Sequence, residues 1–244
     1  MMIVPRAGDS LHKSWLYRLL TEIADDVFLA SVLRFKGGTC AAMRGLVNRF
    51  SVDLDFDLVD ESKQSQVSQH LEKIFQKLGL AIKDHSRKVP QYFLKYDNGE
   101  NLRSTIQLDI NTQPPKENQY EIVRLHDIDR VLHCHTVPTM VANKLVATVS
   151  RFQRRGVLVG RDVYDLHAFL LQGLPFSEEI IQERTGKSPK MFFRRLKKCI
   201  EKSLTQQIID QDLNMLLSPK EFHLIRKFLK QELLRMVGEE MGRL

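Results

Sequence analysis

The chain has 244 residues, of which 43% are hydrophobic and 27% charged, with a formal net charge of +7 and a sequence pI near 9.3. This composition suits one large domain or two small ones built on a hydrophobic core, and it excludes a fibrous or wholly disordered chain. The three cysteines form no CxxC pair, and no apolar run approaches the ~20 residues of a membrane span. We therefore expect a cytoplasmic protein with no membrane partner.

The charge is unevenly distributed along the chain. Residues 1–115 carry 15 basic and 14 acidic side chains, whereas residues 116–244 carry 22 basic and 16 acidic ones. Nearly all of the excess positive charge therefore lies in the C-terminal half, and this half is compatible with a polyanionic partner.

The first predicted elements are a long helix, a short strand and a glycine turn. A helix capped by Asp9 or Ser10 is expected to run to about Leu33, because apolar residues recur at helical spacing. A strand ending at Phe35-Lys36 then leads into Gly37-Gly38-Thr39, which opens a short helix over residues 39–48. Glycines let backbone approach a ligand closely, and a helix N-terminus offers N–H groups to phosphate. We therefore expect Gly37, Gly38 and the Thr39 hydroxyl to bind nucleotide phosphates.

The next predicted element is a strand that carries acids on one face. Asp53, Asp55 and Asp57 alternate with apolar residues, so they share a face of the strand. Asp53 and Asp55 would lie roughly 6.7 Å apart, and their charges would repel by about 2–3 kcal/mol at an effective dielectric of ~20. A divalent cation removes this repulsion, and hard oxygen ligands suit Mg²⁺. The simpler alternative is a solvated strand edge; the role of Asp57, as a bystander or a competing ligand, is left open.

These residues carry a family resemblance. The Gly-Gly-Thr turn, the short helix and the following Arg-Phe-Ser-x-Asp-Leu-Asp-Phe run over residues 49–56 resemble the AbiEii/AbiGii toxin family. That family has the nucleotidyltransferase fold of the DNA polymerase β type. The resemblance implies that Asp53 and Asp55 bind the metal.

The middle of the chain is expected to supply a third acid. A helix capped by Asp60 or Ser62 should end at Gly79, followed by a strand over residues 80–85. Residues 91–97 and 103–111 read as paired strands joined by a turn over residues 97–101. Asp109 lies on the polar face of the second strand and is predicted to join Asp53 and Asp55. The alternative is a surface Asp on an edge strand.

The second half of the chain begins after Pro114-Pro115, with a short strand and connection over residues 120–136. A helix over residues 139–154 contains Lys144, and the next helix contains Arg161-Asp162-Val163-Tyr164-Asp165. This pair of segments also resembles the AbiEii-like pattern. A Lys ammonium suits a triphosphate, and Asp162 could hold that Lys or act as general base. The alternative is an ion pair on a helix surface.

Residues 176–244 are predicted to be helical throughout. Ser188-Pro189 and Ser218-Pro219 read as helix starts. Phe192 and Phe193, followed by Arg194-Arg195 and Lys197-Lys198, form a candidate nucleic-acid surface. Equally, the two phenylalanines could lie in the core beneath a solvated basic face.

Taken together, we expect an α/β fold. A polymerase β-type nucleotidyltransferase domain with a mixed sheet and an N-terminal helix would occupy residues 1–115. A mainly helical domain over residues 116–244 would complete the active site. The expected catalytic residues are Asp53, Asp55, Asp109, Lys144 and Asp162, with metal at Asp53, Asp55 and Asp109, and nucleotide at Gly37, Gly38, Thr39, Lys144, Arg161 and Asp165.

The resemblance implies a toxin of a toxin–antitoxin or phage-defence system. It would transfer a nucleoside monophosphate from an NTP to an acceptor such as the 3′ end of tRNA or another RNA, with Mg²⁺ or Mn²⁺ as cofactor and a cognate antitoxin as partner. Two alternatives stay open: a toxin that binds nucleotide without turnover, and a nucleotidyltransferase acting on a small molecule such as an antibiotic.

Overall fold

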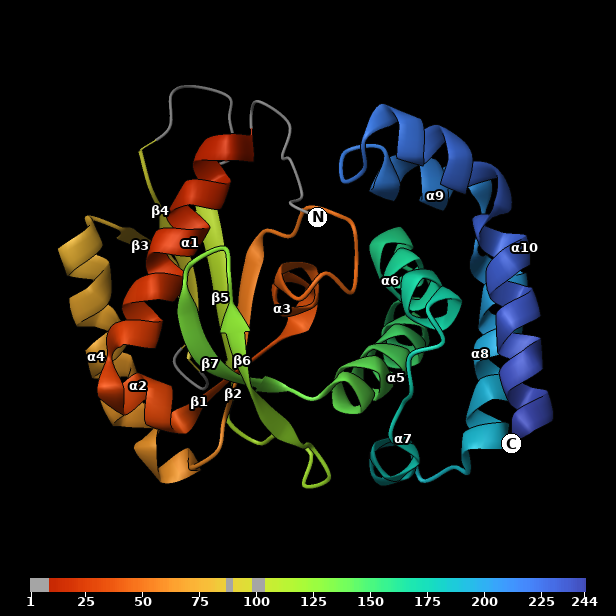
Figure 1. The fold of residues 1–244 in the computed structure, drawn as a ribbon, viewed down its shortest axis with the longest axis horizontal. Helices are drawn as coiled ribbons and strands as arrows, with labels where there is room; N and C mark the ends of the chain where they lie inside the picture. Colours follow the sequence, from red (N-terminus) through yellow and green to blue (C-terminus); the bar gives the residue numbers. More distant parts are fainter. Residues whose placement is uncertain (1–8, 87–89, 98–103) are drawn as a thin grey trace. The chain divides into compact units, whose positions relative to one another are not determined.

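The computed structural model describes residues 9–86, 90–97 and 104–244, and the chain divides into two compact units (Figure 1). The first unit comprises Met1–Gly45, Phe50–Pro114 and Tyr120–His135; the second comprises Leu46–Arg49, Pro115–Gln119 and Thr136–Leu244. The division into a nucleotidyltransferase domain over residues 1–115 and a helical domain over residues 116–244 stays a prediction. In the structure, residues 120–135 belong to the first unit, because they pair with its sheet.

The first unit is built on a mixed sheet, as the sequence predicts. Among the described residues the sheet has seven strands in the order β3-β4-β5-β2-β1-β7-β6. The pairs β1–β7 and β2–β5 are parallel, and the other four pairs are antiparallel. The strand bounds are β1 Leu33–Lys36, β2 Asp53–Leu58, β3 Ala81–His85, β4 Gln91–Lys95, β5 Thr105–Asn111, β6 Tyr120–Leu125 and β7 Arg130–His135. The predicted turn between β4 and β5 falls largely outside the described residues.

The segment over residues 120–136 differs from the expected single strand and connection. It forms two antiparallel strands, β6 and β7, with Tyr120 opposite His135 and Leu125 opposite Arg130. Asp129 has a positive φ of 50° in the turn that joins them. Asp tolerates this left-handed conformation better than most residues, so the chain can reverse at this point.

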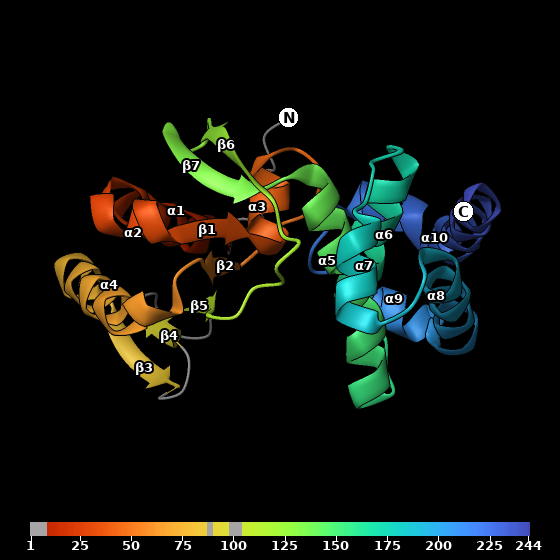
Figure 2. The same ribbon diagram turned by 90° about the horizontal axis from the view of Figure 1, so that it is seen from below.

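Three helices cover one face of the sheet (Figures 1 and 2): α1 Ser10–Asp25, α2 Val27–Val32 and α4 Gln64–Leu78. The expected single helix up to residue 33 is wrong, because it is interrupted at Asp26. Asp26 has an extended backbone, and its carboxylate accepts a hydrogen bond of 2.9 Å from the Leu29 N–H. Asp at this position caps a new helix, which explains the break. The short 3₁₀ helix η2 Glu61–Lys63 precedes α4, which ends at Gly79 in the left-handed conformation as predicted.

The apolar face of β2 forms the centre of this core. Leu54, Phe56 and Leu58 are almost fully buried, and the Phe56 ring lies 5.2 Å from that of Phe35 on the neighbouring strand. Because side chains alternate across a strand, the three aspartates of β2 project from the opposite face. The amphipathic pattern of the strand thus determines which face of the sheet carries the acids.

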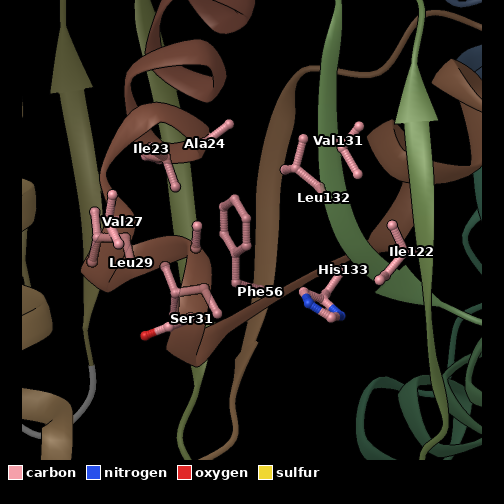
Figure 3. A pocket seen from close by; sticks show the side chains of 12 residues that line it. Ile23, Ala24, Val27, Leu29, Ser31, Phe56, Ile122, Val131, Leu132 and His133 are labelled. Atoms are coloured by element: carbon pink, nitrogen blue, oxygen red, sulfur yellow. The ribbon is translucent and has the colours of Figure 1, made fainter.

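The first unit also contains an apolar pocket of about 340 Å³ (Figure 3). Its walls come from α1, α2 and β1 on one side and from β6 and β7 on the other, with Phe56 between them. None of the predicted site residues lines it, so the pocket and the predicted chemistry are separate features.

The second unit is helical throughout its described elements, as predicted. Its helices are α5 Val137–Arg155, α6 Gly160–Leu171, α7 Glu178–Thr185, α8 Pro189–Ser203, α9 Gln206–Leu213 and α10 Pro219–Arg243. Ser188 caps α8, and Ser218 with Glu221 forms the predicted capping box of α10. Among the described residues, no helix is long and apolar enough to cross a membrane.

The aromatic and basic residues of α8 separate onto different sides of the helix. Phe192 and Phe193 are 1% and 0% exposed, so they belong to the core and cannot stack on bases. Of the two interpretations that the sequence left open, the one with both phenylalanines in the core beneath a solvated basic face is confirmed. Basic side chains of the same helix, including Arg194, Lys198 and Lys202, are exposed.

Candidate active site

Two predicted acids meet across neighbouring strands. β2 and β5 run parallel and in register, so that Asp55 lies directly opposite Asp109 and Asp53 opposite Gln107. Neighbouring strands are ~4.8 Å apart, and directly opposed residues share a face. Two like charges in this arrangement repel and weaken the strand pair. The structure thus brings Asp53, Asp55 and Asp109 onto one face of adjacent strands, as the sequence predicts.

Asp109 is held by amide groups. The Gln91 side chain donates to one carboxylate oxygen at 2.6 Å, and the Gln107 side chain donates to the other at 2.7 Å. Both donors are neutral, so they fix the orientation of the carboxylate without cancelling its charge. Gln91 comes from β4 and Gln107 from β5, so two adjacent strands contribute to this small network.

The glycine turn lies against the acid strand. β1 leads into α3 Gly37–Met43, and Gly37 has a φ of +79°. A Cβ at this position would lie only 2.1 Å from Oδ2 of Asp55, so any side chain larger than hydrogen would collide with that carboxylate. Gly37 is therefore required both by its backbone conformation and by its contact with Asp55.

Thr39 has a different contact from the one expected. Its side chain is 2% exposed, and its hydroxyl donates to the backbone carbonyl of Asp53. This bond ties α3 to the first residue of β2. A phosphate contact by Gly38 and Thr39 stays a prediction, and the described hydroxyl has a structural partner.

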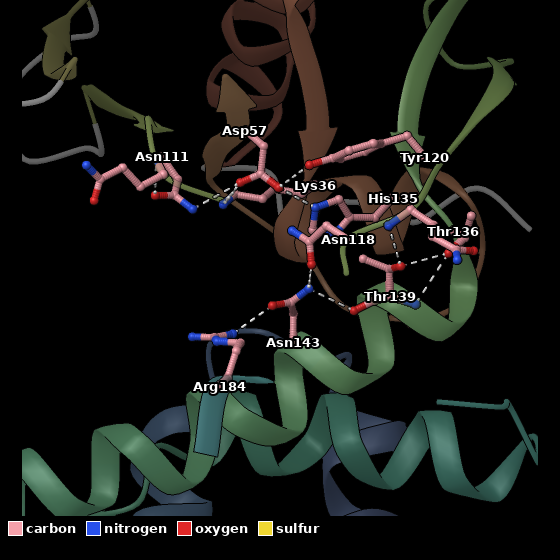
Figure 4. A network of polar contacts seen from close by, with 12 residues as sticks. Lys36, Asp57, Asn111, Asn118, Tyr120, His135, Thr136, Thr139, Asn143 and Arg184 are labelled. Carbon is pink, nitrogen blue, oxygen red and sulfur yellow. Dashed lines mark hydrogen bonds and ion pairs between the residues drawn. The ribbon is translucent and has the colours of Figure 1, made fainter. Parts of the chain in front are cut away.

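Asp57 lies at the centre of a separate polar cluster, which we call the Asp57 cluster: Lys36, Asp57, Asn111, Tyr120 and His135 (Figure 4). The Asp57 carboxylate is fully buried. Lys36 donates to Oδ1, whereas His135 and Tyr120 donate to Oδ2 at 2.7 and 3.1 Å. Asn111 adds a longer contact of 3.3 Å to Oδ1.

The electrostatics of this cluster decide the role of Asp57. Burial alone would raise the pKa of Asp57, but the hydrogen bond from His135 and the charge of Lys36 hold it far below its usual value. Burial lowers the pKa of His135, and this effect outweighs the attraction of the carboxylate. At neutral pH, Asp57 is therefore an anion compensated by Lys36, with His135 as a neutral donor. This makes Asp57 a structural anion, which answers the question left open by the sequence.

The predicted residues of the second unit form a charged cluster, which we call the Asp162 cluster: Arg49, Lys144, Arg151, Asp162 and Asp165. The Lys144 ammonium lies 3.2 Å from Asp162 and 2.9 Å from Asp165. Arg49 forms a bidentate pair with Asp165. Since Asp162 and Asp165 are 3% and 0% exposed, the alternative of an ion pair on a helix surface is wrong.

The pKa values in this cluster follow from its ion pairs. Burial would lower the pKa of Lys144, but the charges of Asp165 and Asp162 raise it above its usual value. Burial would raise the pKa of Asp165, but Arg49 and Lys144 hold it below its usual value. Arg161, in contrast, is exposed on α6. The predicted nucleotide contacts of Arg161 and Asp165 stay predictions.

Several residues of these clusters escaped the sequence analysis. Arg49 belongs to the Arg-Phe-Ser run that carries the family resemblance, yet only its acids were singled out. Arg151 follows Lys144 by seven residues, the spacing that returns to the same side of a helix, and this signal was available. Tyr120 and His135 reach Asp57 only through the strand order, which no local pattern reveals.

The acid face can be tested for its fit to a divalent cation. Asp53, Asp55 and Asp109 offer hard carboxylate oxygens on adjacent strands, which is the donor type that Mg²⁺ prefers. Within residues 9–86, 90–97 and 104–244, no three His, Cys, Asp or Glu side chains are already grouped as a metal site. The donor chemistry fits, and the side chains would have to adjust around an ion.

A mixed sheet with paired aspartates beside a glycine turn, followed by a helical unit, is the arrangement expected of a nucleotidyltransferase. Residues 18–235 match the family model described as nucleotidyl transferase AbiEii toxin, type IV toxin–antitoxin system. The chain therefore belongs to the AbiEii toxin family, and it is a nucleotidyltransferase of a toxin–antitoxin context, for which an NTP is the implied substrate and an antitoxin the implied partner.

Solved structures support the fold. MenT4, a nucleotidyltransferase toxin from Mycobacterium tuberculosis, aligns with a TM-score of 0.56 and 15% identity, over 97% of this chain and 87% of its own. JHP933 from Helicobacter pylori aligns with a TM-score of 0.53 and 18% identity, over 98% of this chain and 97% of its own. Comparison with curated protein sequences finds no match.

Proposed function

We propose that the protein is a Mg²⁺-dependent nucleotidyltransferase that transfers a nucleoside monophosphate from an NTP to the 3′ end of tRNA. The observation that carries the metal assignment is the direct opposition of Asp55 and Asp109 on β2 and β5. The hydrogen bonds described for Asp109 come from two neutral amides, which orient its carboxylate. Two carboxylates held face to face in this way are best compensated by a divalent cation.

Each residue has an assigned part in this proposal. Asp53, Asp55 and Asp109 would hold Mg²⁺, which supplies Lewis-acid stabilisation of the charge that develops during transfer. Gly37 leaves room beside Asp55 for this arrangement, and Lys144 would bind the triphosphate. Mn²⁺ has the same ligand preference and is the alternative ion.

The transfer step itself is a substitution at phosphorus. The oxygen of the acceptor 3′ hydroxyl forms a bond to the α-phosphorus, and the bond from that phosphorus to the α,β-bridging oxygen breaks. Pyrophosphate leaves with the bonding electrons, and the hydroxyl proton passes to solvent. No oxidant or reductant is needed, so the reaction is balanced by the NTP and the acceptor alone.

The choice of a polyanionic acceptor rests on charge. The second half of the chain carries six more basic than acidic side chains, and α8 exposes Arg194, Lys198 and Lys202. Exposed cations on one helix suit the phosphates of an RNA, and their contribution falls with added salt. A cationic small molecule such as an aminoglycoside would be repelled by the same surface.

The test uses purified protein, Mg²⁺, total tRNA and each α-³²P-labelled NTP in turn. We expect label on tRNA from one NTP or a few, with none after addition of EDTA and a rate about 1,000-fold lower with the Asp55→Asn variant. Periodate-oxidised tRNA lacks the 3′ diol and should remain unlabelled. Label on oxidised tRNA would exclude the 3′ end as acceptor. Full activity of Asp55→Asn would contradict the metal assignment.

The outcome with tRNA also separates the alternatives. Tight NTP binding without any transfer would favour a toxin that binds nucleotide without turnover. Label that appears only on an added aminoglycoside would favour the small-molecule reaction. In either case the fold and family would stand, and the acceptor proposed here would be wrong.

A further inference from the structure

The Asp162 cluster is a network of ion pairs. Its five described side chains are three cations and two carboxylates, joined by four ion pairs. Buried charges are normally paired, because an uncompensated ion that is removed from water costs several kcal/mol. Two of the cations in this cluster keep part of their surface exposed, so they can bind an anion as well as their carboxylate partners.

The exposure of the three cations indicates which of them can reach such an anion. Arg49 is 5% exposed and is engaged by both oxygens of Asp165, so it is an internal partner. Lys144 and Arg151 are 18% and 29% exposed. The ligand-facing cations of the cluster are therefore Lys144, which the sequence predicts, and Arg151, which it does not.

Asp162 joins these two cations. Its Oδ1 accepts from the Lys144 ammonium, and its Oδ2 accepts from Nη1 of Arg151. Lys144 and Arg151 lie seven residues apart on α5, which places them about two turns apart on the same side of the helix. A guanidinium has five N–H donors in a rigid fork, and the described contact with Asp162 uses the Nη1 group. Further donors of Arg151 can therefore bind a second acceptor.

We infer that Arg151 is a phosphate-binding residue, which forms with Lys144 a two-cation site for the pyrophosphate portion of the nucleotide, and that Asp162 is the positioning residue of both cations. The inference rests on the proposed function and names a further residue of that reaction. Arg151 suits this role because its planar fork binds phosphate oxygens in pairs, whereas Lys144 acts as a point charge. Asp162 has both oxygens committed to cations, which fits positioning better than proton abstraction from an acceptor.

The first experiment measures binding of inorganic pyrophosphate to the full chain by calorimetry, without metal or acceptor. We compare the wild type with Arg151→Gln and with Arg154→Gln, which removes an exposed cation one turn further along the same helix. Loss of a charge-assisted hydrogen bond should raise the Kd of Arg151→Gln about 10- to 100-fold, whereas Arg154→Gln should stay within about twofold. Equal affinities of Arg151→Gln and the wild type would overturn the inference.

A second measurement on the wild type covers the case in which Arg151→Gln does not fold. Phenylglyoxal modifies accessible arginines, and mass spectrometry gives the rate at each position. Pyrophosphate should slow the modification of Arg151 and leave that of Arg154 unchanged. Equal rates at Arg151 with and without pyrophosphate would contradict the inference, even if the transfer assay succeeds.

The role of Asp162 is tested with Asp162→Asn, which keeps the size of the side chain and removes its charge. A positioning residue should change the KM for NTP, and the pH–rate profile of the residual transfer should keep its acid limb. Loss of a general base should instead lower kcat by about 100- to 10,000-fold at unchanged KM, and the acid limb should disappear. That second pattern would overturn the positioning role. The pyrophosphate measurements need no turnover, so a failure of the transfer proposal would be seen separately.

Discussion

Asp57 and Asp109 lie on the same face of the sheet, but their hydrogen-bonding partners differ in charge. Asp57 has a cation and neutral donors around it, and the ammonium of Lys36 compensates its charge inside the protein. Asp109, one strand away and opposite Asp55, is oriented by the neutral amides of Gln91 and Gln107. The comparison shows that residue type and strand face do not define function. What distinguishes a structural acid from a candidate metal ligand is whether its partners neutralise it.

The largest effect is expected at the acid pair. Asp55→Asn keeps the shape of the side chain but removes one of the two facing charges, so affinity for the metal should fall. We expect the rate of nucleotidyl transfer to fall about 1,000-fold, equivalent to ~4 kcal/mol in the barrier. The free energy of unfolding should change by less than about 1 kcal/mol, because the repulsion with Asp109 is also relieved.

This variant is measured by label transfer and by urea denaturation of the same preparation. Asp97→Asn, at an exposed position beyond β4, is the matched control and should be neutral in both measurements. If Asp55→Asn instead loses stability and keeps its activity, the distinction between the two sites is reversed.

At the Asp57 cluster we expect a substitution to lower stability, whereas at the acid pair it lowers activity. Asp57→Ala removes the anion and leaves Lys36 and His135 beside a buried cavity without their acceptor. Breaking a buried pair by removal of one partner typically costs about 3–5 kcal/mol, so we expect the free energy of unfolding to fall by that amount. Urea denaturation measures the loss, and Asp97→Ala is the control. A change below about 1 kcal/mol would show that the cluster does not stabilise the sheet.

The contrast between the two sites also explains what could be predicted from the sequence. Alternation along β2 placed Asp53 and Asp55 on one face, and the polar positions of β5 correctly suggested Asp109 beside them. These are local patterns with a period of two residues. The partners of Asp57 lie 21, 54, 63 and 78 residues away in the chain, on four other strands. Their convergence depends on the strand order, and no local pattern contains that information.

The same limit applies to the helices. The break at Asp26 went unpredicted because the apolar periodicity continues across it, and the role of Asp26 as a cap is seen only in its extended backbone and its bond with the Leu29 N–H. The pairing of Lys144 with Asp162 was anticipated from the family pattern, whereas its burial was not. Burial changes the interpretation of that pair. A solvated ion pair contributes little to stability, whereas the desolvation cost of a buried pair must be offset by its partners.

A smaller effect is expected from the amides that orient Asp109. Gln91→Ala removes the donor to Oδ1 but leaves the carboxylate and its charge in place. Loss of a group that orients a metal ligand typically costs 10- to 100-fold, and because Gln107 remains, we expect the lower end, about 10-fold in transfer rate. Gln76→Ala, at an exposed position of α4, is the control. An unchanged rate would mean that Gln107 alone suffices to orient Asp109.

The last prediction concerns the pH dependence of stability that arises from the Asp57 cluster. Because burial lowers the pKa of His135 below its unfolded value of about 6.5, the unfolded chain binds the proton more readily than the folded one. The free energy of unfolding should therefore fall as the pH is lowered below about 6.5. Asp57 has a lowered pKa as well, so its contribution is complete above its unfolded pKa of about 3.9 and is lost only in stronger acid. The two groups thus act in different pH windows and in the same direction.

His135→Gln isolates the first window, since glutamine can still donate to Asp57 but does not titrate. Denaturation curves at pH 7.5 and 5.5 should show a smaller loss of stability for this variant than for the wild type. Asp57 remains ionised at both pH values, so the difference reports His135 alone. An identical loss in both proteins would mean that His135 titrates equally in the folded and unfolded states. The lowered pKa of His135 would then be wrong, and Asp57 would be compensated by two cations below a pH of about 6.5.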